Sequence, residues 1–274
     1  MSTSAKTSSR KVNFLRRLDI RFPWLKIAGI CLVGAIILID LLNLTVPAVN
    51  DPYDKIKIAP MSYHVRVTKR SPEGKMLVAL TFDDGPSIET TPALLDILYE
   101  KDVLATFFML GSKAKNNPEL VRRAESEGHI VASHTMYHQN LIRISASALT
   151  SDIAESKAVF NDILGHSPTL TRPPYGNFNK TVSSAIDTPL ILWSVDTLDW
   201  KNKSTEAIMS TALSQVHDGA IILMHDIHPT TVATVPTLID SLRKSGYEFV
   251  TVPELAEARG VNLKNGSAYY NLRP

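Results

Sequence analysis

Cysteine is almost absent from this sequence, because Cys31 is the only one in 274 residues. The chain therefore cannot form an internal disulfide, which excludes the small secreted domains that disulfides hold together. The residue immediately before Cys31 is Ile30, not the Gly or Ala of a lipid-modified bacterial cysteine, and the leucine of that motif is also missing. Internal repeats and low-complexity tracts are absent as well. The remaining composition, 44% hydrophobic and 20% charged, is that of one large or two small globular domains.

A net positive charge is confined to the first residues of the chain. Residues 1–26 carry seven Lys or Arg and a single acid, Asp19. The formal net charge of +2, less the +6 of this segment, leaves −4 for residues 27–274. That balance argues against a nucleic-acid-binding surface. We expect residues 1–26 to be a cytoplasmic basic segment.

Directly after the basic segment comes an apolar run without charge or proline, "IAGICLVGAIILI" (27–39). Continued to residue 46 it spans about 20 residues, enough to cross a hydrocarbon core of ~30 Å as a helix. Basic residues before it and few after it place the N-terminus in the cytoplasm and the rest outside the cell. We therefore expect residues 27–46 to anchor the protein in the cell membrane as a transmembrane helix. A buried core helix is one alternative. A signal peptide cleaved at "VPA" (46–48) is the other, which the long basic lead and Pro47 disfavour.

Beyond the anchor, the sequence predicts a stem over residues 47–74, rich in proline and charge, and one domain over residues 75–274. Strand-like and helix-like segments alternate in this domain, including a long helix around residues 146–164. The strand segments are continuously apolar, as in a parallel sheet covered on both faces. About seven β/α units predict an α/β fold, either a (β/α) barrel or an open doubly wound sheet.

Polar and charged residues stand where the predicted strands end. In a parallel barrel these ends open on one face, which carries the active site. Turn chemistry alone explains "TFDDGP" (81–86) but not the recurrence of such residues at five strand ends. The residues are Asp83 and Asp84 after "MLVAL", His134 after "HIVAS" with His138 four residues on, Arg172 after "TLT", Asp196 and Asp199 after "LILWSV", and His225 after "AIILM".

The histidines predict a metal site. His134 and His138 are four residues apart, so one helical turn would point both toward a shared metal, with Asp83 or Asp84 as third ligand. Three protein ligands leave positions open for water and substrate, as in a catalytic zinc site. "HTMYH" is not the H-E-x-x-H of zinc proteases, because Thr135 stands where their glutamate would be.

The remaining residues suit hydrolysis of an acyl compound. The second aspartate of the pair can take a proton from water that the metal activates, and Arg172 can keep that carboxylate ionised. His225 can protonate the leaving group, with Asp199 or Asp196 orienting it. The "RPPYG" turn can offer a backbone N–H to the developing oxyanion.

The ordered set "TFDDGP", "HTMYH", "RPPYG", "DTLDW" and "LMH" resembles the five motifs of the NodB-homology polysaccharide deacetylases, carbohydrate esterase family four, over about residues 75–260. The resemblance implies an incomplete, distorted (β/α) barrel of about seven parallel strands. It also implies a role for each matched residue: Asp83 as base, Asp84, His134 and His138 as metal ligands, Arg172 as partner of the base, the Tyr175 N–H in the oxyanion hole, Asp199 orienting the acid His225, and Leu223 and Trp200 lining the acetyl pocket.

These features lead us to expect a membrane-anchored, metal-dependent enzyme that removes N-acetyl groups from a cell-wall polysaccharide. Zn²⁺ is the expected metal, with Co²⁺ or Mn²⁺ as alternatives. Peptidoglycan N-acetylglucosamine is the expected substrate; muramic acid residues, chitin, poly-N-acetylglucosamine and O-acetyl xylan are alternatives, and an inactive carbohydrate-binding domain is the rival class. We expect His228 to be a surface residue and Trp193, Phe107 and Phe108 to be core residues.

Overall fold

The computed structural model describes residues 75–274. The predicted basic segment, membrane anchor and stem lie outside the described residues. Within residues 75–274, no helix combines the length and the apolar character needed to cross a bilayer.

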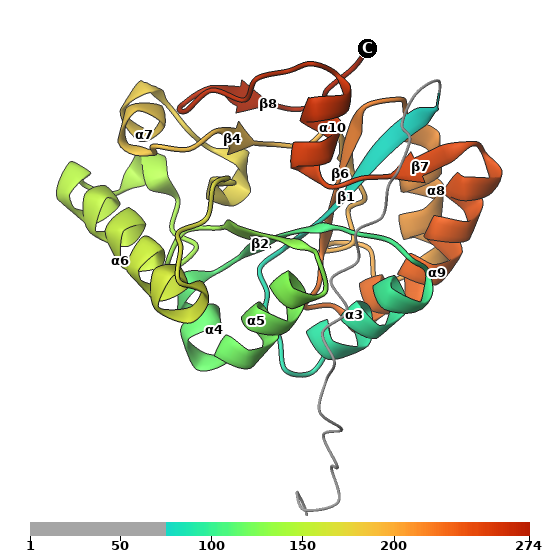
Figure 1. The fold of residues 1–274 in the computed structure, drawn as a ribbon, viewed down its shortest axis with the longest axis horizontal. Helices are drawn as coiled ribbons and strands as arrows, with labels where there is room; N and C mark the ends of the chain where they lie inside the picture. Colours follow the sequence, from blue (N-terminus) through green and yellow to red (C-terminus); the bar gives the residue numbers. More distant parts are fainter. Residues whose placement is uncertain (1–74) are drawn as a thin grey trace, which may run out of the picture. The chain divides into compact units, whose positions relative to one another are not determined.

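Strands and helices alternate along most of this part of the chain (Figure 1). The strands are β1 (Met76–Asp83), β2 (Thr106–Met109), β3 (Ile130–Ser133), β4 (Leu190–Ile191), β5 (Val195–Asp196), β6 (Ala220–His225), β7 (Tyr247–Phe249) and β8 (Ala268–Tyr269). The helices are α3 (Thr91–Glu100), α4 (Gly111–Asn116), α5 (Pro118–Ser126), α6 (Ala146–Leu164), α7 (Lys180–Ala185), α8 (Thr205–Gln215), α9 (Pro229–Lys244) and α10 (Val252–Ala258), with short 3-10 helices η1 (Leu141–Arg143) and η2 (Pro174–Gly176).

The main sheet is parallel throughout, in the order β3-β2-β1-β6-β5. On one edge of β1, β7 pairs with the first residues and β2 pairs with the last residues. β6 pairs along the other edge of β1. Helices α3 to α9 form an arc around these strands (Figure 1). The prediction of a parallel-strand α/β fold is confirmed.

The predicted strand "TLT" (169–171) is reduced to one residue. Thr171 forms parallel bridges to Ser133 on one side and Leu190 on the other. Pro168 precedes it and Pro173 follows it, and proline cannot donate to a strand ladder. "LILWSV" is likewise split into β4 and β5. Pairing nevertheless continues from β3 through Thr171 and residues 190–196 to β6, because Val195 pairs with Ile222.

Strand alternation decides which side chains reach the interior of this ring of strands. In β1, Val78, Leu80 and Phe82 pack toward the helices in one core cluster, whereas Leu77 and Ala79 belong to the opposite cluster. Side chains two residues apart share a face, so Asp83 continues the inner row of Leu77 and Ala79. The same rule puts Leu223 and His225 of β6 on the inner face with Ile221. The inner faces of β1 and β6 therefore carry Asp83 and His225 at their carboxyl ends.

Helix α6 covers the residues predicted for the long helix. The Ser145 hydroxyl caps its first turn by accepting the N–H of Ala148 at 3.2 Å. It ends at Gly165, whose φ of 81° places it in the left-handed region that favours glycine. Leu149 and Phe160 on its inner face are buried, as the helical spacing predicts.

Candidate active site

A cavity of about 390 Å³ opens at the carboxyl ends of the parallel strands. Arg172 and Asp199 are not in its wall, because both are buried behind it. The cavity brings together eight of the ten residues predicted for the site. Its lining is Asp83, Asp84, His134, His138, Tyr175, Trp193, Asp196, Trp200, Leu223 and His225.

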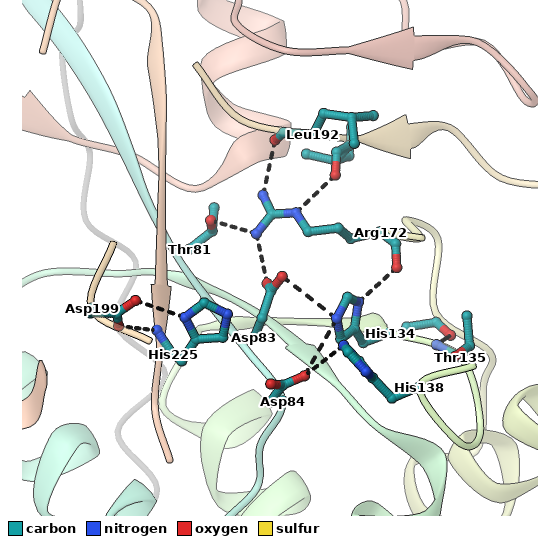
Figure 2. Close-up of polar contacts among 12 residues, drawn as sticks. Thr81, Asp83, Asp84, His134, Thr135, His138, Arg172, Leu192, Asp199 and His225 are labelled. Atoms are coloured by element: carbon teal, nitrogen blue, oxygen red, sulfur yellow. Dashed lines mark hydrogen bonds and ion pairs between the residues drawn. The ribbon is translucent and has the colours of Figure 1, made fainter. Parts of the chain in front are cut away.

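Asp83 and Arg172 form a buried ion pair at the base of the cavity (Figure 2). Nη1 of Arg172 lies 2.6 Å from Oδ1 of Asp83, and the guanidinium has no exposed surface. Burial raises the pKa of Asp83 above its ordinary value, and the charge of Arg172 counters that rise. A carboxylate held in this way suits a general base, whose pKa should lie nearer the working pH than that of a free aspartate.

Asp84 faces a different direction from Asp83 because its backbone is left-handed, with φ of 73°. Its Oδ1 lies 3.5 Å from Nε2 of His134 and 3.3 Å from Nε2 of His138. The three candidate ligand atoms all lie within 4.8 Å of one another. This cluster matches the metal ligands that the resemblance implies.

The chemistry of these side chains fits a divalent cation. Oδ1 of Asp84 is buried and has no hydrogen-bond partner among the described residues. Nδ1 of His134 lies 2.7 Å from the carbonyl oxygen of Arg172, to which it can donate a proton, so Nε2 keeps its lone pair for a metal. Burial lowers the pKa of His134 to about 3, so the imidazole is neutral as a ligand must be.

The prediction that one helical turn carries the two histidines is wrong. Residues 134–138 form an irregular loop after β3, in which Thr135 and His138 have φ of 71° and 57°. The two left-handed residues fold the chain back on itself, which brings the His134 and His138 rings to 5.0 Å between centroids. A loop held by tertiary contacts, and not a helical turn, therefore brings the two histidine side chains together.

His225 is paired with Asp199 rather than with Asp196. Nδ1 of His225 lies 2.8 Å from Oδ1 of Asp199, whereas Oδ1 of Asp196 accepts the N–H of Leu198 at 2.9 Å. Burial alone would lower the pKa of His225, but the hydrogen bond and charge of Asp199 outweigh it and raise the pKa to about 9. His225 is therefore protonated at neutral pH, as a general acid requires.

The other predicted residues form the cavity wall. Leu223 is buried beneath it, whereas Trp200 and Tyr175 stand at its rim with 51% and 60% of their surface exposed. Tyr175 has a strained φ of 61°, and its ring meets the edge of His138 at 4.7 Å. Trp193, predicted as core, also lines the cavity because the break between β4 and β5 exposes one side of it.

Sequence reasoning missed two threonines that complete the charge pairs. The hydroxyl of Thr231 donates to Oδ2 of Asp199 at 2.7 Å, and that of Thr81 accepts from Arg172 at 2.8 Å. Thr81 lies two residues before Asp83 on the same inner face, so the alternation in β1 could have identified it. Nothing in the local sequence links Thr231, in the first turn of α9, to Asp199.

Comparisons of this chain with a family model and with known proteins point to the same family. Residues 70–188 match the family model described as polysaccharide deacetylase. A peptidoglycan-N-acetylglucosamine deacetylase of Listeria monocytogenes is 45% identical over 194 residues, which are 71% of this chain but only 41% of that protein. A peptidoglycan-N-acetylglucosamine deacetylase of Bacillus cereus is 36% identical over 207 residues, 73% of this chain and 95% of that one.

A solved structure supports the same assignment. The family 4 acetyl xylan esterase from Clostridium thermocellum, in complex with a cobalt ion, superposes with a TM-score of 0.68 at 30% identity. The match covers 72% of this chain and 98% of the esterase. The fold, the site and these relatives agree: the chain belongs to the polysaccharide deacetylase family.

Proposed function

We propose that this chain is a metal-dependent hydrolase that removes N-acetyl groups from peptidoglycan N-acetylglucosamine. The observation that carries the proposal is the placement, around one cavity, of the Asp84–His134–His138 cluster together with two charge pairs, the buried Asp83–Arg172 and the part-buried Asp199–His225. Acetyl hydrolysis needs a base, an acid and a cation at one carbonyl, and this cavity has a residue for each.

Asp84, His134 and His138 would hold the cation. Two imidazoles and one carboxylate favour Zn²⁺, and Co²⁺ or Mn²⁺ suits the same donors. When bound, a divalent cation polarises the acetyl carbonyl and makes water a stronger acid.

Asp83 then accepts the proton of the water whose oxygen attacks the acetyl carbon, while Arg172 holds the carboxylate in place. The Tyr175 N–H would face the carbonyl oxygen as it gains negative charge. His225, kept protonated by Asp199, donates its proton to the sugar nitrogen as the C–N bond breaks. The products are acetate and a free amino sugar.

The Listeria monocytogenes relative supports peptidoglycan as the substrate, since its identity of 45% is higher than the 30% of the xylan esterase. The esterase keeps O-acetyl xylan as a second candidate, because it shares the fold. An outward-facing anchor at residues 27–46 would place the catalytic domain at the cell wall. N-terminal sequencing of the mature protein tests this placement, because cleavage near residue 48 would exclude the anchor.

Acetate release by the purified full-length protein tests the proposed function. The substrates are peptidoglycan fragments acetylated only on glucosamine or only on muramic acid, chitooligomers and acetylated xylan. We expect the glucosamine-acetylated fragments to be preferred, a chelator to abolish the activity, and Zn²⁺ or Co²⁺ to restore it. Release from none of these substrates by metal-loaded protein would instead support a binding domain.

Amide substitutions should separate the two adjacent aspartates. Asp83→Asn should keep its bound metal and lose about 10²–10⁴-fold in kcat, the usual contribution of a positioned general base. Asp84→Asn should lose metal affinity first, and excess metal should restore part of its activity, because an amide oxygen is a weaker ligand. Metal content, kcat and thermal melting of both variants distinguish these effects from unfolding. Metal loss at Asp83 with normal metal binding in the Asp84 variant would reverse the two assignments.

Asp199→Asn should change the pH dependence of kcat/KM. Asp199 raises the pKa of His225, so the acid form of His225 in the wild type persists until the pH rises through that raised value. The amide removes the charge, so the alkaline limb of the profile should move to lower pH. Asp196→Asn is the matched control, since Asp196 lines the same cavity without touching His225, and its limb should stay in place. An unmoved limb in Asp199→Asn would exclude His225 as the acid.

A further inference from the structure

The loop over residues 134–138, here called the metal-ligand loop, carries two of the three candidate ligands without regular secondary structure. Left-handed backbone at two residues other than glycine, Thr135 and His138, is unfavourable. Such a conformation persists only where surrounding groups hold it. The hydrogen bonds of this loop therefore determine where the two imidazoles lie.

The carbonyl groups of the loop are held by helix α4. The N–H of Gly111 donates to the Thr135 carbonyl at 2.9 Å, and that of Ser112 donates to the Met136 carbonyl at 3.1 Å. These are N–H groups of the first turn of a helix, which have no partner within the helix itself. The N–H groups at the start of α4 and the carbonyl groups of the loop thus satisfy each other's hydrogen bonds.

Two N–H groups of the loop, those of Met136 and Tyr137, face one side chain, Asp152 of α6. Its Oδ1 accepts the N–H of Met136 at 2.8 Å. The N–H of Tyr137 also points to this carboxylate and, like that of Met136, favours its charged form. Asp152 therefore contacts the backbone of the two residues that precede His138.

Asp152 is buried, with 2% of its surface exposed. A buried carboxylate is costly unless it is paired or hydrogen-bonded. Among the described residues no cation acts on Asp152, and Oδ2 has no hydrogen-bond partner. The loop N–H groups thus compensate for the burial of the Asp152 carboxylate. If this position only had to fill space, a neutral side chain would do so without the cost of burying a charge.

We propose that Asp152 is a positioning residue that fixes the metal-ligand loop and thereby sets the affinity of the site for its divalent cation. The inference rests on the metal site of the proposed function. Asp152 touches neither imidazole; it acts through the backbone of Met136 and Tyr137. A role in stability alone would lower the melting temperature and leave metal affinity unchanged, so the two roles make different predictions.

The test is a Zn²⁺ titration of the full-length protein in competition with a chromophoric chelator. Asp152→Ala should weaken Zn²⁺ binding by about 10–100-fold, the usual effect of losing a group that orients a ligand. Asp152→Asn should weaken it by less, because the amide oxygen can still accept the Met136 N–H. Saturating Zn²⁺ should restore most of kcat in Asp152→Ala with KM unchanged. Asp162→Asn is the matched control, since it removes an exposed carboxylate from the same helix, and its affinity should equal that of the wild type.

Unchanged Zn²⁺ affinity in folded Asp152→Ala would overturn the inference, as would equal weakening in Asp162→Asn. If Asp152→Ala does not fold, Asp152→Ser replaces it, because its hydroxyl is too short to reach the loop and the same loss is expected. Melting temperatures measured without metal confirm that each variant is folded. A wild-type protein that binds no Zn²⁺, Co²⁺ or Mn²⁺ would contradict the proposed metal site itself, which is a different outcome.

Discussion

Arg172 lies wholly inside the ring of strands, where a guanidinium must have its charge and its N–H groups satisfied together. It does so by bonding to two segments far apart in the sequence: Asp83 and Thr81 of β1, and the carbonyl groups of Ile191 and Leu192. Its plane also stacks on the ring of Phe108 at 4.0 Å. The ion pair with Asp83 therefore joins β1 to the short, irregular strands that continue the ring on its far side.

The same residue links this framework to the chemistry. The side chain of Arg172 fixes the candidate base, and its backbone carbonyl fixes the tautomer of His134 (Figure 2). The candidate base Asp83 and the candidate metal ligand His134 thus both depend on Arg172, the residue that follows the single-residue bridge at Thr171. On the other side of the cavity Asp199 plays a similar part, since it bonds both the ring and the backbone N–H of His225. Asp83, His134 and His225 are thus each held by a buried partner of opposite charge or by a backbone carbonyl.

Sequence patterns predicted those features of the fold that depend on the local sequence. Apolar runs ending in Asp83 and His225 predicted the parallel strands and the strand ends that carry the site, and the spacing in residues 146–164 predicted α6. Sequence patterns failed where tertiary contacts override local preference. The loop at His134 was predicted as a helical turn, because nothing nearby in the sequence reveals that α4 and Asp152 hold its backbone. Thr231 was missed for the same reason. Trp193, predicted as core, lies in the break between β4 and β5 and lines the cavity.

A double-mutant cycle on Asp83 and Arg172 tests most directly whether their ion pair supports both the fold and the site. The quantity measured is the free energy of unfolding of Asp83→Asn, Arg172→Met and the double variant. Each single change leaves one buried group without its partner and should cost about 3–5 kcal/mol. Because the double change removes both charges, it should cost clearly less than the sum of the single changes. Additivity within about 0.5 kcal/mol would show that the two residues act independently and would contradict the account.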